Sequence, residues 1–325
     1  MSEAFLSTYE DLKYSGFDIL GFIFTIMLSY SQAFYGLKER LQQMYEASEA
    51  AAISHSFMEY LTGLGKLDRL DKKDVLLTTA QQELYETKTK EIAAGKPIQY
   101  VTGSAWFMGR EFCVNDHVLI PRPETEELVE WIVEDVNKRR PILNDQERVL
   151  SVLDIGTGSG CIPISLKLAL PGAEVTSCDI SADALSVARN NASKLQSEIC
   201  LIQTDFLDAS DHNKLGMYDV IVSNPPYIPV SEKDRLDKNV RDFEPGIALF
   251  VPDSDALVFY RAIAIFGKEH LSRNGYIYCE MDAAHAQECK TLFEQLGYQD
   301  VCIKKDMHGN WRMLRAGGKD ESLTS

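Results

Sequence analysis

The fold of this 325-residue chain is decided by the stretch Val149-Leu150-Ser151-Val152-Leu153-Asp154-Ile155-Gly156-Thr157-Gly158-Ser159-Gly160. Residues 149–155 are largely apolar and predict a buried strand of a parallel sheet. Three glycines at alternate positions follow, and a helical pattern begins at Cys161. A glycine-rich turn between a strand and a helix lets a ligand approach the backbone and points helix N–H groups toward it. The stretch therefore predicts an α/β domain with a ligand site at this turn.

The spacing of the glycines restricts the kind of ligand. No Gly-Lys-Ser/Thr sequence follows, so the turn is not a phosphate loop, and the glycines are closer together than in the dinucleotide fingerprint G-x-G-x-x-G. The next predicted strand, 174–178, leads to Asp179, whose carboxylate at a strand tip can bond both hydroxyls of a ribose. Asp179 beside Ser181 also has the alternative role of a helix cap. With Asp154 and the glycines, Asp179 predicts a nucleoside site without a pyrophosphate, which S-adenosylmethionine fits better than NAD or ATP.

A second predicted strand leads into the sequence Asn224-Pro225-Pro226-Tyr227. Two consecutive prolines cannot continue a central strand, so the chain must turn after the near-continuous apolar run 218–223. Pro225 keeps its carbonyl oxygen and Asn224 adds another on its side chain, so two acceptors can hold both hydrogens of an NH2 group. Tyr227 offers an aromatic face to a flat group. The pattern predicts catalytic roles for Asn224, Pro225 and Tyr227, and an ordinary strand-ending turn with a packed tyrosine is the alternative.

These two motifs together resemble those of class I methyltransferases that methylate amide or exocyclic amino nitrogen. Three further stretches narrow the resemblance to the HemK/PrmC family, the release-factor glutamine methyltransferases. They are Gly95-Lys96-Pro97-Ile98-Gln99-Tyr100-Val101-Thr102-Gly103, Leu119-Ile120-Pro121-Arg122-Pro123-Glu124-Thr125-Glu126 and Arg241-Asp242-Phe243-Glu244-Pro245. The resemblance covers roughly residues 30–316. Asn-Pro-Pro-Tyr alone is shared with adenine-N6 methyltransferases, whereas the stretch 119–126 is much more specific.

The resemblance implies both a fold and a reaction. The expected fold is α/β, a Rossmann-like seven-stranded class I methyltransferase domain with one reversed strand, preceded by a small helical bundle and a β-hairpin linker. The expected reaction transfers a methyl group from S-adenosylmethionine to the side-chain amide nitrogen of the glutamine in the Gly-Gly-Gln motif of class 1 peptide chain release factors. The alternatives are an adenine-N6 methyltransferase acting on DNA or RNA, a glutamine methyltransferase of a ribosomal protein, and a non-enzymatic module that only binds S-adenosylmethionine.

The resemblance also assigns residues to the site. Asp205 is expected near the adenine amino group and Phe206 on the adenine face, although Phe206 has the alternative of a core position. Arg241 and Glu244 are expected to hold the loop after the catalytic motif and to shape the glutamine pocket, with a surface ion pair as the alternative. The expected cofactor-binding residues are Gly156, Thr157, Gly158, Ser159, Gly160, Asp179, Asp205, Phe206 and Asn224. The expected substrate-binding residues are Asn224, Pro225, Pro226, Tyr227, Arg241 and Glu244.

We expect five parts along the chain. Apolar residues recur at helical spacing over 31–95, Gly109-Arg110 lies at the centre of a predicted β-hairpin, and strands alternate with helices beyond residue 124. A final short strand, 311–314, is expected to pair antiparallel with its predecessor. The parts are an N-terminal extension 1–28, a helical substrate-recognition domain 29–102, a β-hairpin linker 103–120, a methyltransferase domain 121–316 and a disordered tail 317–325.

Composition restricts the partners and the compartment. Lys and Arg total 33 against 49 acidic residues, a formal net charge of −16 that argues against a self-sufficient DNA binder. We therefore expect a protein substrate and no stable nucleic-acid partner. The seven cysteines form no C-x-x-C pair and no cluster with histidine at zinc spacing. This pattern predicts no metal, and free thiols in a reducing cytoplasm.

The apolar run 17–28 is the one stretch that could suggest a membrane. It is too short to span a bilayer, it contains Asp18, and the residues before it lack the basic start of a signal peptide. We expect no membrane partner and interpret the run as a helix packed on the body. A second hypothesis is that Met27 is the true start of translation.

Overall fold

The computed structural model describes residues 27–142 and 149–319. The chain divides into two compact units, the first up to Lys90 and the second from Glu91 onward. Nearly all of the expected N-terminal extension 1–28, and the end of the expected tail 317–325, lie outside the described residues. Among the helices of the described residues, none has the length and apolar character needed to cross a membrane.

The first unit is the predicted helical bundle. Ser29 and Gln32 cap each other's backbone at the start of its first helix, and Gly63, with φ at 68°, ends the second. The amphipathic spacing read from the sequence buries one face of each helix, with Leu37 and Phe57 almost fully covered. Its helices are α2 (Tyr30–Leu41), α3 (Ala47–Thr62), α4 (Lys66–Asp71) and α5 (Thr79–Ala93), the last of which continues into the second unit.

The second unit begins earlier than we expected. The short helix α6 (Ile98–Thr102) belongs to it, because Tyr100 packs beside Val118 and donates its hydroxyl proton to the Val118 carbonyl at 2.6 Å. The expected domain boundary at residue 102 follows α6, whereas the contacts within the chain divide it after Lys90. The predicted hairpin follows as β1 (Ser104–Phe107) and β2 (Arg110–Cys113), joined by a two-residue turn whose positive φ angles suit the twist of antiparallel strands.

A seven-stranded sheet forms the centre of the second unit. Its strands lie in the order β10-β11-β9-β6-β3-β4-β5, and only β11 runs opposite to the others. This arrangement confirms the predicted α/β fold with one reversed strand. The strands are β3 (Ser151–Ile155), β4 (Glu174–Asp179), β5 (Cys200–Gln203), β6 (Tyr218–Ser223), β9 (Leu271–Glu280), β10 (Tyr298–Lys305) and β11 (Trp311–Lys319).

The last strand is longer than the sequence pattern indicated. It was expected over 311–314 and ends at Lys319, so residues 317–319 belong to the sheet and not to a tail. Gly317 pairs with Tyr276 of β9, and the Tyr276 ring covers the position where a side chain would stand. Two glycines in succession hide this end of the strand from a pattern-based prediction, because glycine weakens strand propensity.

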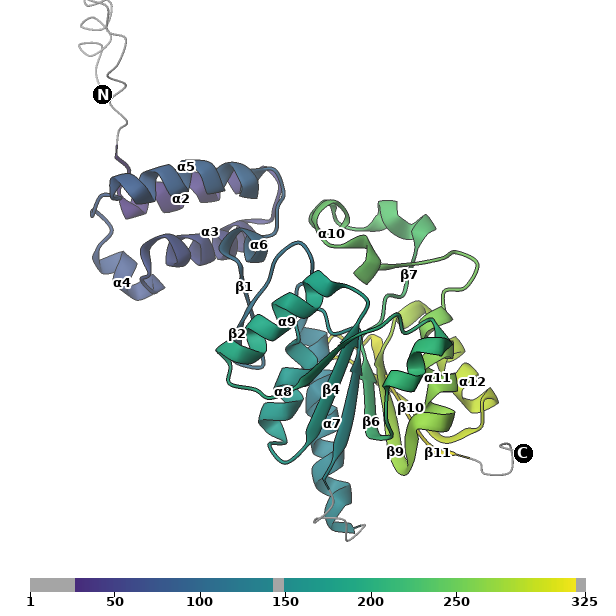
Figure 1. Ribbon diagram of the computed structural model, residues 1–325. Helices are drawn as coiled ribbons and strands as arrows, with labels where there is room; N and C mark the ends of the chain where they lie inside the picture. The colour runs from purple at the N-terminus through teal and green to yellow at the C-terminus, as the bar shows by residue number, and fades with distance from the viewer. Residues whose placement is uncertain (1–26, 143–148, 320–325) are drawn as a thin grey trace, which may run out of the picture. The chain divides into compact units, whose positions relative to one another are not determined.

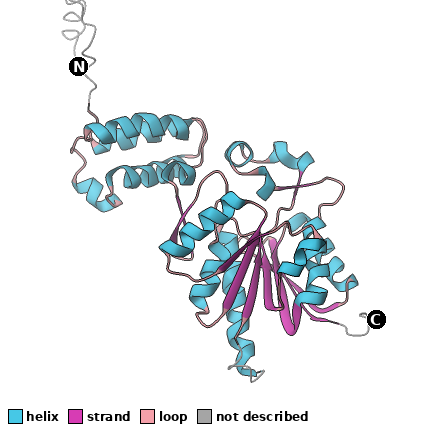
Figure 2. Cartoon of the chain, in the orientation of Figure 1, coloured by secondary structure: helices cyan, strands magenta, loops and turns pink. Residues whose placement is uncertain are grey.

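Helices cover both faces of the sheet, as Figures 1 and 2 show. Helices α7 (Pro123–Ile142), α8 (Cys161–Ala169) and α9 (Ala182–Lys194) lie on one face, and α11 (Val258–His270) and α12 (Ala286–Gln295) lie on the other. Two apolar cores result, one on each side of the central strands. Burial on both faces explains why β3 and β6 are apolar almost throughout rather than alternating.

A segment between β6 and α11 crosses above the carboxyl end of the sheet. It contains two short strands, β7 (Ile228–Pro229) and β8 (Phe250–Val251), that pair in parallel with each other. Between them lie the short helix α10 (Lys238–Phe243) and a 3-10 turn, Gly246–Ala248. The sequence pattern did not predict these strands, because each has only two residues.

Gly267 on α11 offers a test of how closely the helix packs on the sheet. A methyl group there would overlap the Tyr298 hydroxyl and the Ile277 side chain. We expect Gly267→Ala to lower the free energy of unfolding by about 1–3 kcal/mol, as overpacking does. Gly172→Ala is the control, since a methyl group there meets nothing within 4 Å. Urea unfolding checks both variants, and equal midpoints would contradict the close packing.

Candidate active site

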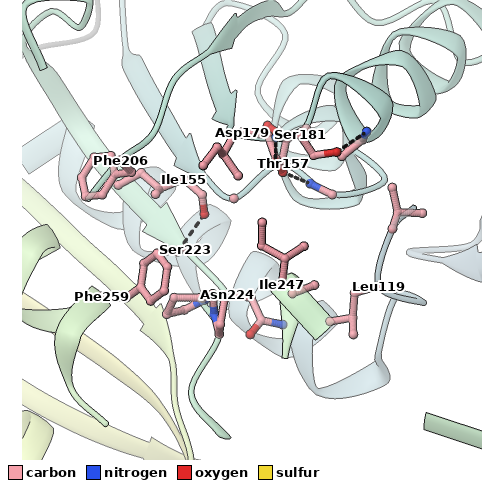
Figure 3. A pocket seen from close by; sticks show the side chains of 18 of the residues that line it. Leu119, Ile155, Thr157, Asp179, Ser181, Phe206, Ser223, Asn224, Ile247 and Phe259 are labelled. Carbon is pink, nitrogen blue, oxygen red and sulfur yellow. Dashed lines mark hydrogen bonds between the residues drawn. The ribbon is translucent and has the colours of Figure 1, made fainter. Parts of the chain in front are cut away.

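A cavity of about 390 Å³ lies at the carboxyl ends of β3, β4 and β6. Its wall includes Ile155 at the end of β3, Asp179 at the end of β4 and Asn224 after β6. In Figure 3, Asp179 lies on one side of the cavity and Asn224 on the other, with Phe206 and Leu119 at the two flanks. The glycine-rich turn, Asp179 and the Asn-Pro-Pro-Tyr motif therefore lie together at the place where open α/β sheets bind ligands.

The glycine-rich turn forms one wall of the cavity. Gly156, Gly158 and Gly160 all have φ between 53° and 81°, a conformation that favours glycine. A side chain added at Gly156 or Gly158 would meet nothing within 4 Å, so the space before the turn is open to a ligand. Gly160 has the opposite surroundings, because a methyl group there would press on Ile164 and Ala188. The first two glycines thus leave room for a ligand, and the third lets α8 approach α9.

The surroundings of Asp179 are compatible with both of its expected roles, ribose binding and a contact at the start of a helix. Its Oδ2 accepts a hydrogen bond from the Gly158 N–H and its Oδ1 one from the Ser181 N–H, both at 2.9 Å. The Ser181 hydroxyl, in turn, caps α9 at the Ala184 N–H. Burial raises the pKa of Asp179, and these backbone N–H groups oppose that rise. Each carboxylate oxygen keeps a further lone pair that can accept from a ligand hydroxyl.

Asp154 lies beneath the glycine turn and is fully buried. Its Oδ2 accepts the Ser177 hydroxyl proton at 2.5 Å, whereas among the described residues its Oδ1 has no hydrogen-bond partner. Burial raises the pKa of Asp154 to about 7, against the lowering effect of Ser177. A half-satisfied buried carboxyl is costly and needs either a proton or a further partner.

Asp205 and Phe206 both border the cavity. Phe206 also packs edge-on against Phe266 and tilts over His212, so the core position weighed as its alternative is real as well. The exposed Asp205 accepts the Leu207 N–H at 3.0 Å. Their roles toward an adenine remain predictions.

The Asn224 side chain bonds Thr125, which in turn bonds Glu280. Its Nδ2 donates to the Thr125 hydroxyl oxygen at 3.2 Å, and the Thr125 hydroxyl donates to Glu280 Oε2 at 2.6 Å. Thr125 stands in the first turn of α7 and Glu280 at the end of β9. Because the NH2 end of the amide faces Thr125, the amide oxygen Oδ1 points to the side away from Thr125.

Pro225 and Pro226 also line the cavity, but Tyr227 has different surroundings. Tyr227 packs against the apolar core formed by β9 and α11. Burial raises the pKa of its hydroxyl. This is the packed tyrosine that was the alternative to an aromatic face for the substrate, and the catalytic role of Tyr227 remains a prediction.

Glu244 and Arg241 do not pair with each other. The Glu244 side chain is 1% exposed. Its carboxylate pairs with the Arg122 guanidinium and accepts a hydrogen bond from the Ile120 N–H. This burial excludes a surface ion pair for Glu244. The Arg241 guanidinium bonds Asp242 at 2.8 Å. Glu244, in the loop after residues 224–227, is thus bonded to Arg122, which lines the cavity. A substrate contact of Arg241 stays a prediction.

Sequence reasoning missed three residues at the site. Thr125 lies inside the stretch 119–126 without an expected role, and Glu280 lies in the region where only alternating strands and helices are predicted. The buried Asn191 of α9 was missed entirely, although it bonds the Ser159 carbonyl of the glycine turn and both backbone groups of Cys113 in the hairpin. Only the folded chain brings these partners together. In the described part of the chain, no cluster of three His, Cys, Asp or Glu side chains could hold a metal ion.

Asp154 predicts a pH dependence of stability. The folded carboxyl has a pKa of about 7 against 3.8 for the ordinary group, so the folded state keeps its proton to higher pH than the unfolded state. The free energy of unfolding should therefore fall as pH rises toward 7. We expect Asp154→Asn to make this decline shallower by up to about 1.4 kcal/mol per pH unit. Urea unfolding from pH 5 to 8 measures it, and identical slopes in both proteins would refute it.

Family models match both parts of the chain. The PrmC N-terminal domain matches residues 32–103, and the Methyltransferase small domain matches residues 141–240. Among solved structures, the hMettl16 catalytic domain in complex with MAT2A 3'UTR hairpin 6 is similar with a TM-score of 0.50. It is 17% identical and covers 78% of this chain and 87% of its own, so this likeness shows the fold alone.

Two relatives are more similar to this chain in sequence. The release factor glutamine methyltransferase of Flavobacterium psychrophilum is 39% identical, over 85% of this chain and 95% of its own. The release factor glutamine methyltransferase of Bacteroides thetaiotaomicron is 42% identical, over 86% of this chain and 97% of its own. The chain belongs to the release factor glutamine methyltransferase family and is a methyltransferase.

Proposed function

We propose that this chain methylates the side-chain amide nitrogen of the glutamine in the Gly-Gly-Gln motif of class 1 peptide chain release factors, in the cytoplasm. The observation that carries the proposal is the orientation of Asn224. Its NH2 group is turned to Thr125, so its oxygen is left to accept an N–H from a substrate in the cavity. The two relatives described above carry this activity in their names.

The cavity suits S-adenosylmethionine as the methyl donor. Asp179, at the tip of β4, would accept the ribose hydroxyls with the lone pairs that its backbone partners leave free. The open space before Gly156 and Gly158 would admit the rest of the molecule close to the backbone. Phe206 and the exposed Asp205 line the cavity, and we expect both to border the adenine. S-adenosylmethionine, when bound, supplies an electrophilic methyl group on a sulfonium sulfur.

The residues around Asn224 address the weakness of an amide nitrogen as a nucleophile. Its lone pair is delocalised into the carbonyl, so placement must supply the activation. Asn224 Oδ1 and the Pro225 carbonyl would accept the two N–H bonds of the substrate and hold its nitrogen toward the methyl group. Both hydrogen bonds strengthen as the nitrogen becomes positive, so they stabilise the transition state more than the ground state.

We propose that the helical unit binds the release factor. Its described residues carry none of the motifs that line the cavity, which lie from His117 onward. It presents exposed Tyr35, Leu67 and Leu76 to solvent, side chains of the kind that protein interfaces use. The active-site cavity itself needs only the second unit.

Two other substrates compete with the release factor. An adenine-N6 methyltransferase has the same four-residue motif, but its nucleic-acid substrate calls for a basic surface, whereas this chain has a formal charge of −16. A ribosomal protein glutamine is the second competitor. Incubation with labelled S-adenosylmethionine and, separately, release factors, ribosomal proteins and DNA decides among them. Mass spectrometry of the labelled residue should find the Gly-Gly-Gln glutamine, and label on DNA or a ribosomal protein alone would refute the proposal.

The cofactor assignment predicts the behaviour of Asp179→Ala. Loss of the carboxylate removes charge-assisted bonds to the ribose and should weaken S-adenosylmethionine binding by about 1.5–3 kcal/mol. Asp183→Ala is a matched control that removes the same charge four residues later, where the side chain is 72% exposed. Calorimetric titration gives both dissociation constants. Equal binding by the two variants would remove Asp179 from the cofactor site.

The chemistry predicts the ranking of two Asn224 variants. Asn224→Ala should bind S-adenosylmethionine nearly normally and lose turnover about 100- to 1000-fold, because one preorganised acceptor is gone. Asn224→Asp keeps an oxygen toward the substrate but loses the NH2 that bonds Thr125, so we expect partial activity above that of alanine. Single-turnover rates with a release factor measure the ranking. An alanine variant as fast as wild type would make Asn224 a turn residue only.

A further inference from the structure

Thr125 and Glu280 form a hydrogen-bond relay behind Asn224 and have no direct part in the methyl transfer proposed above. Thr125 is 2% exposed and Glu280 is 2% exposed, so water does not compete for their hydrogen bonds. The chain of donors runs from Asn224 Nδ2 to Thr125 Oγ1 at 3.2 Å, and from the Thr125 hydroxyl to Glu280 Oε2 at 2.6 Å. The three residues come from three separate elements, namely the loop after β6, the first turn of α7 and the end of β9.

We propose that Thr125 and Glu280 are positioning residues that fix which end of the Asn224 amide faces the cavity. The proposal rests on the function proposed above, in which Asn224 Oδ1 accepts an N–H of the substrate. An asparagine amide has nearly the same shape in its two flipped orientations, so packing alone does not choose between them. The relay makes the choice chemically, through the direction of its hydrogen bonds.

The direction follows from the acceptor at the end of the relay. An ionised carboxylate only accepts hydrogen bonds, so Glu280 takes the single proton of the Thr125 hydroxyl. The Thr125 oxygen can then only accept, and the Asn224 group facing it must be the NH2. The flipped amide would bring two oxygens together at Thr125 and present an NH2 to the NH2 of the substrate. Such a substrate would meet donors where it needs an acceptor.

The elements that carry the relay are themselves tied together. The buried Tyr260 hydroxyl donates to the Glu280 backbone carbonyl at 3.1 Å, which fixes the end of β9 against α11. Glu126, next to Thr125, accepts the Met108 N–H of the hairpin turn at 2.8 Å. Both ends of the relay are thus anchored outside the cavity, as a rigid support for an active-site side chain requires.

The relay depends on the ionisation of Glu280. Burial raises the pKa of Glu280 to about 7, with Thr125, Arg312 and Arg122 lowering it and Glu124 raising it. Below that pH a protonated Glu280 donates to Thr125, which frees the Thr125 hydroxyl to donate to Asn224 Oδ1 and favours the flipped amide. The other titratable groups that face Glu280 keep their protons there, because burial raises the pKa of each: Tyr227, Tyr260 and Cys161.

The first experiment compares Thr125→Val with Thr125→Ser in the full-length protein. Valine keeps the shape and removes the hydroxyl, whereas serine keeps the hydroxyl. We expect Thr125→Val to lower the single-turnover rate on a release factor on the order of 100-fold, the cost of a misplaced active-site group, with S-adenosylmethionine binding unchanged. Thr125→Ser should restore most of the rate. A valine variant as fast as wild type, or a serine variant as slow as valine, would overturn the relay.

The second experiment measures the pH profile of Glu280→Gln. The wild-type rate should fall as pH drops through about 7, the pKa of Glu280, because the ionised form is active. Glutamine keeps an acceptor oxygen and cannot titrate. The decline of the rate below pH 7, the acidic limb of the profile, should therefore disappear in the variant. The same limb in the variant would overturn the proposal. Failure of the proposed function is separate, since wild type would then leave the release factor unlabelled at every pH, while a failed relay leaves wild-type methylation intact.

Discussion

The alignment of three parallel strand ends is the constraint on which the rest of this structure depends. Ile155 of β3 pairs in register with Cys178 of β4 on one side and with Ser223 of β6 on the other. The Ser223 hydroxyl also donates to the Ile155 carbonyl at 2.7 Å. The glycine turn, Asp179 and Asn224 each follow one of these strand ends, so they leave the sheet at the same level. A slip of one residue would turn every side chain of a strand to the opposite face and separate the groups.

Buried polar groups keep the loops above the strand ends in place. Asp154 and Glu280 are both covered, and burial raises the pKa of each to about 7. Burying a carboxyl group costs stability, so these positions do not serve the core. Each is bonded toward a neighbouring loop instead: Asp154 accepts from Ser177, whose hydroxyl bonds Thr157 of the glycine turn, and Glu280 accepts from Thr125 behind Asn224. The two buried carboxyl groups thus lower the stability of the fold, while their hydrogen bonds define the arrangement of the cavity wall.

The stretch 119–126 is hydrogen-bonded to several separate parts of the second unit. Arg122 pairs with the buried Glu244 of the loop after residues 224–227. Thr125 bonds Asn224 and Glu280, and Glu126 accepts from the hairpin turn at Met108. One short segment therefore connects the hairpin, the crossing segment and the end of β9.

The sequence by itself determined the main strands and helices of this protein and the chemistry of the motifs that follow them. Apolar runs that end in glycine or proline predict buried strands and turns, because local backbone preferences act within a few residues. Asp179 and Asn224 could also be predicted as site residues, because each comes at the end of such an apolar run. Only the tertiary structure decided the partners: Glu244 joins Arg122 across more than a hundred residues, α6 packs with the second unit, and β11 extends to Lys319. The orientation of the Asn224 amide belongs to this second group, because it depends on hydrogen bonds between segments that meet only in the fold.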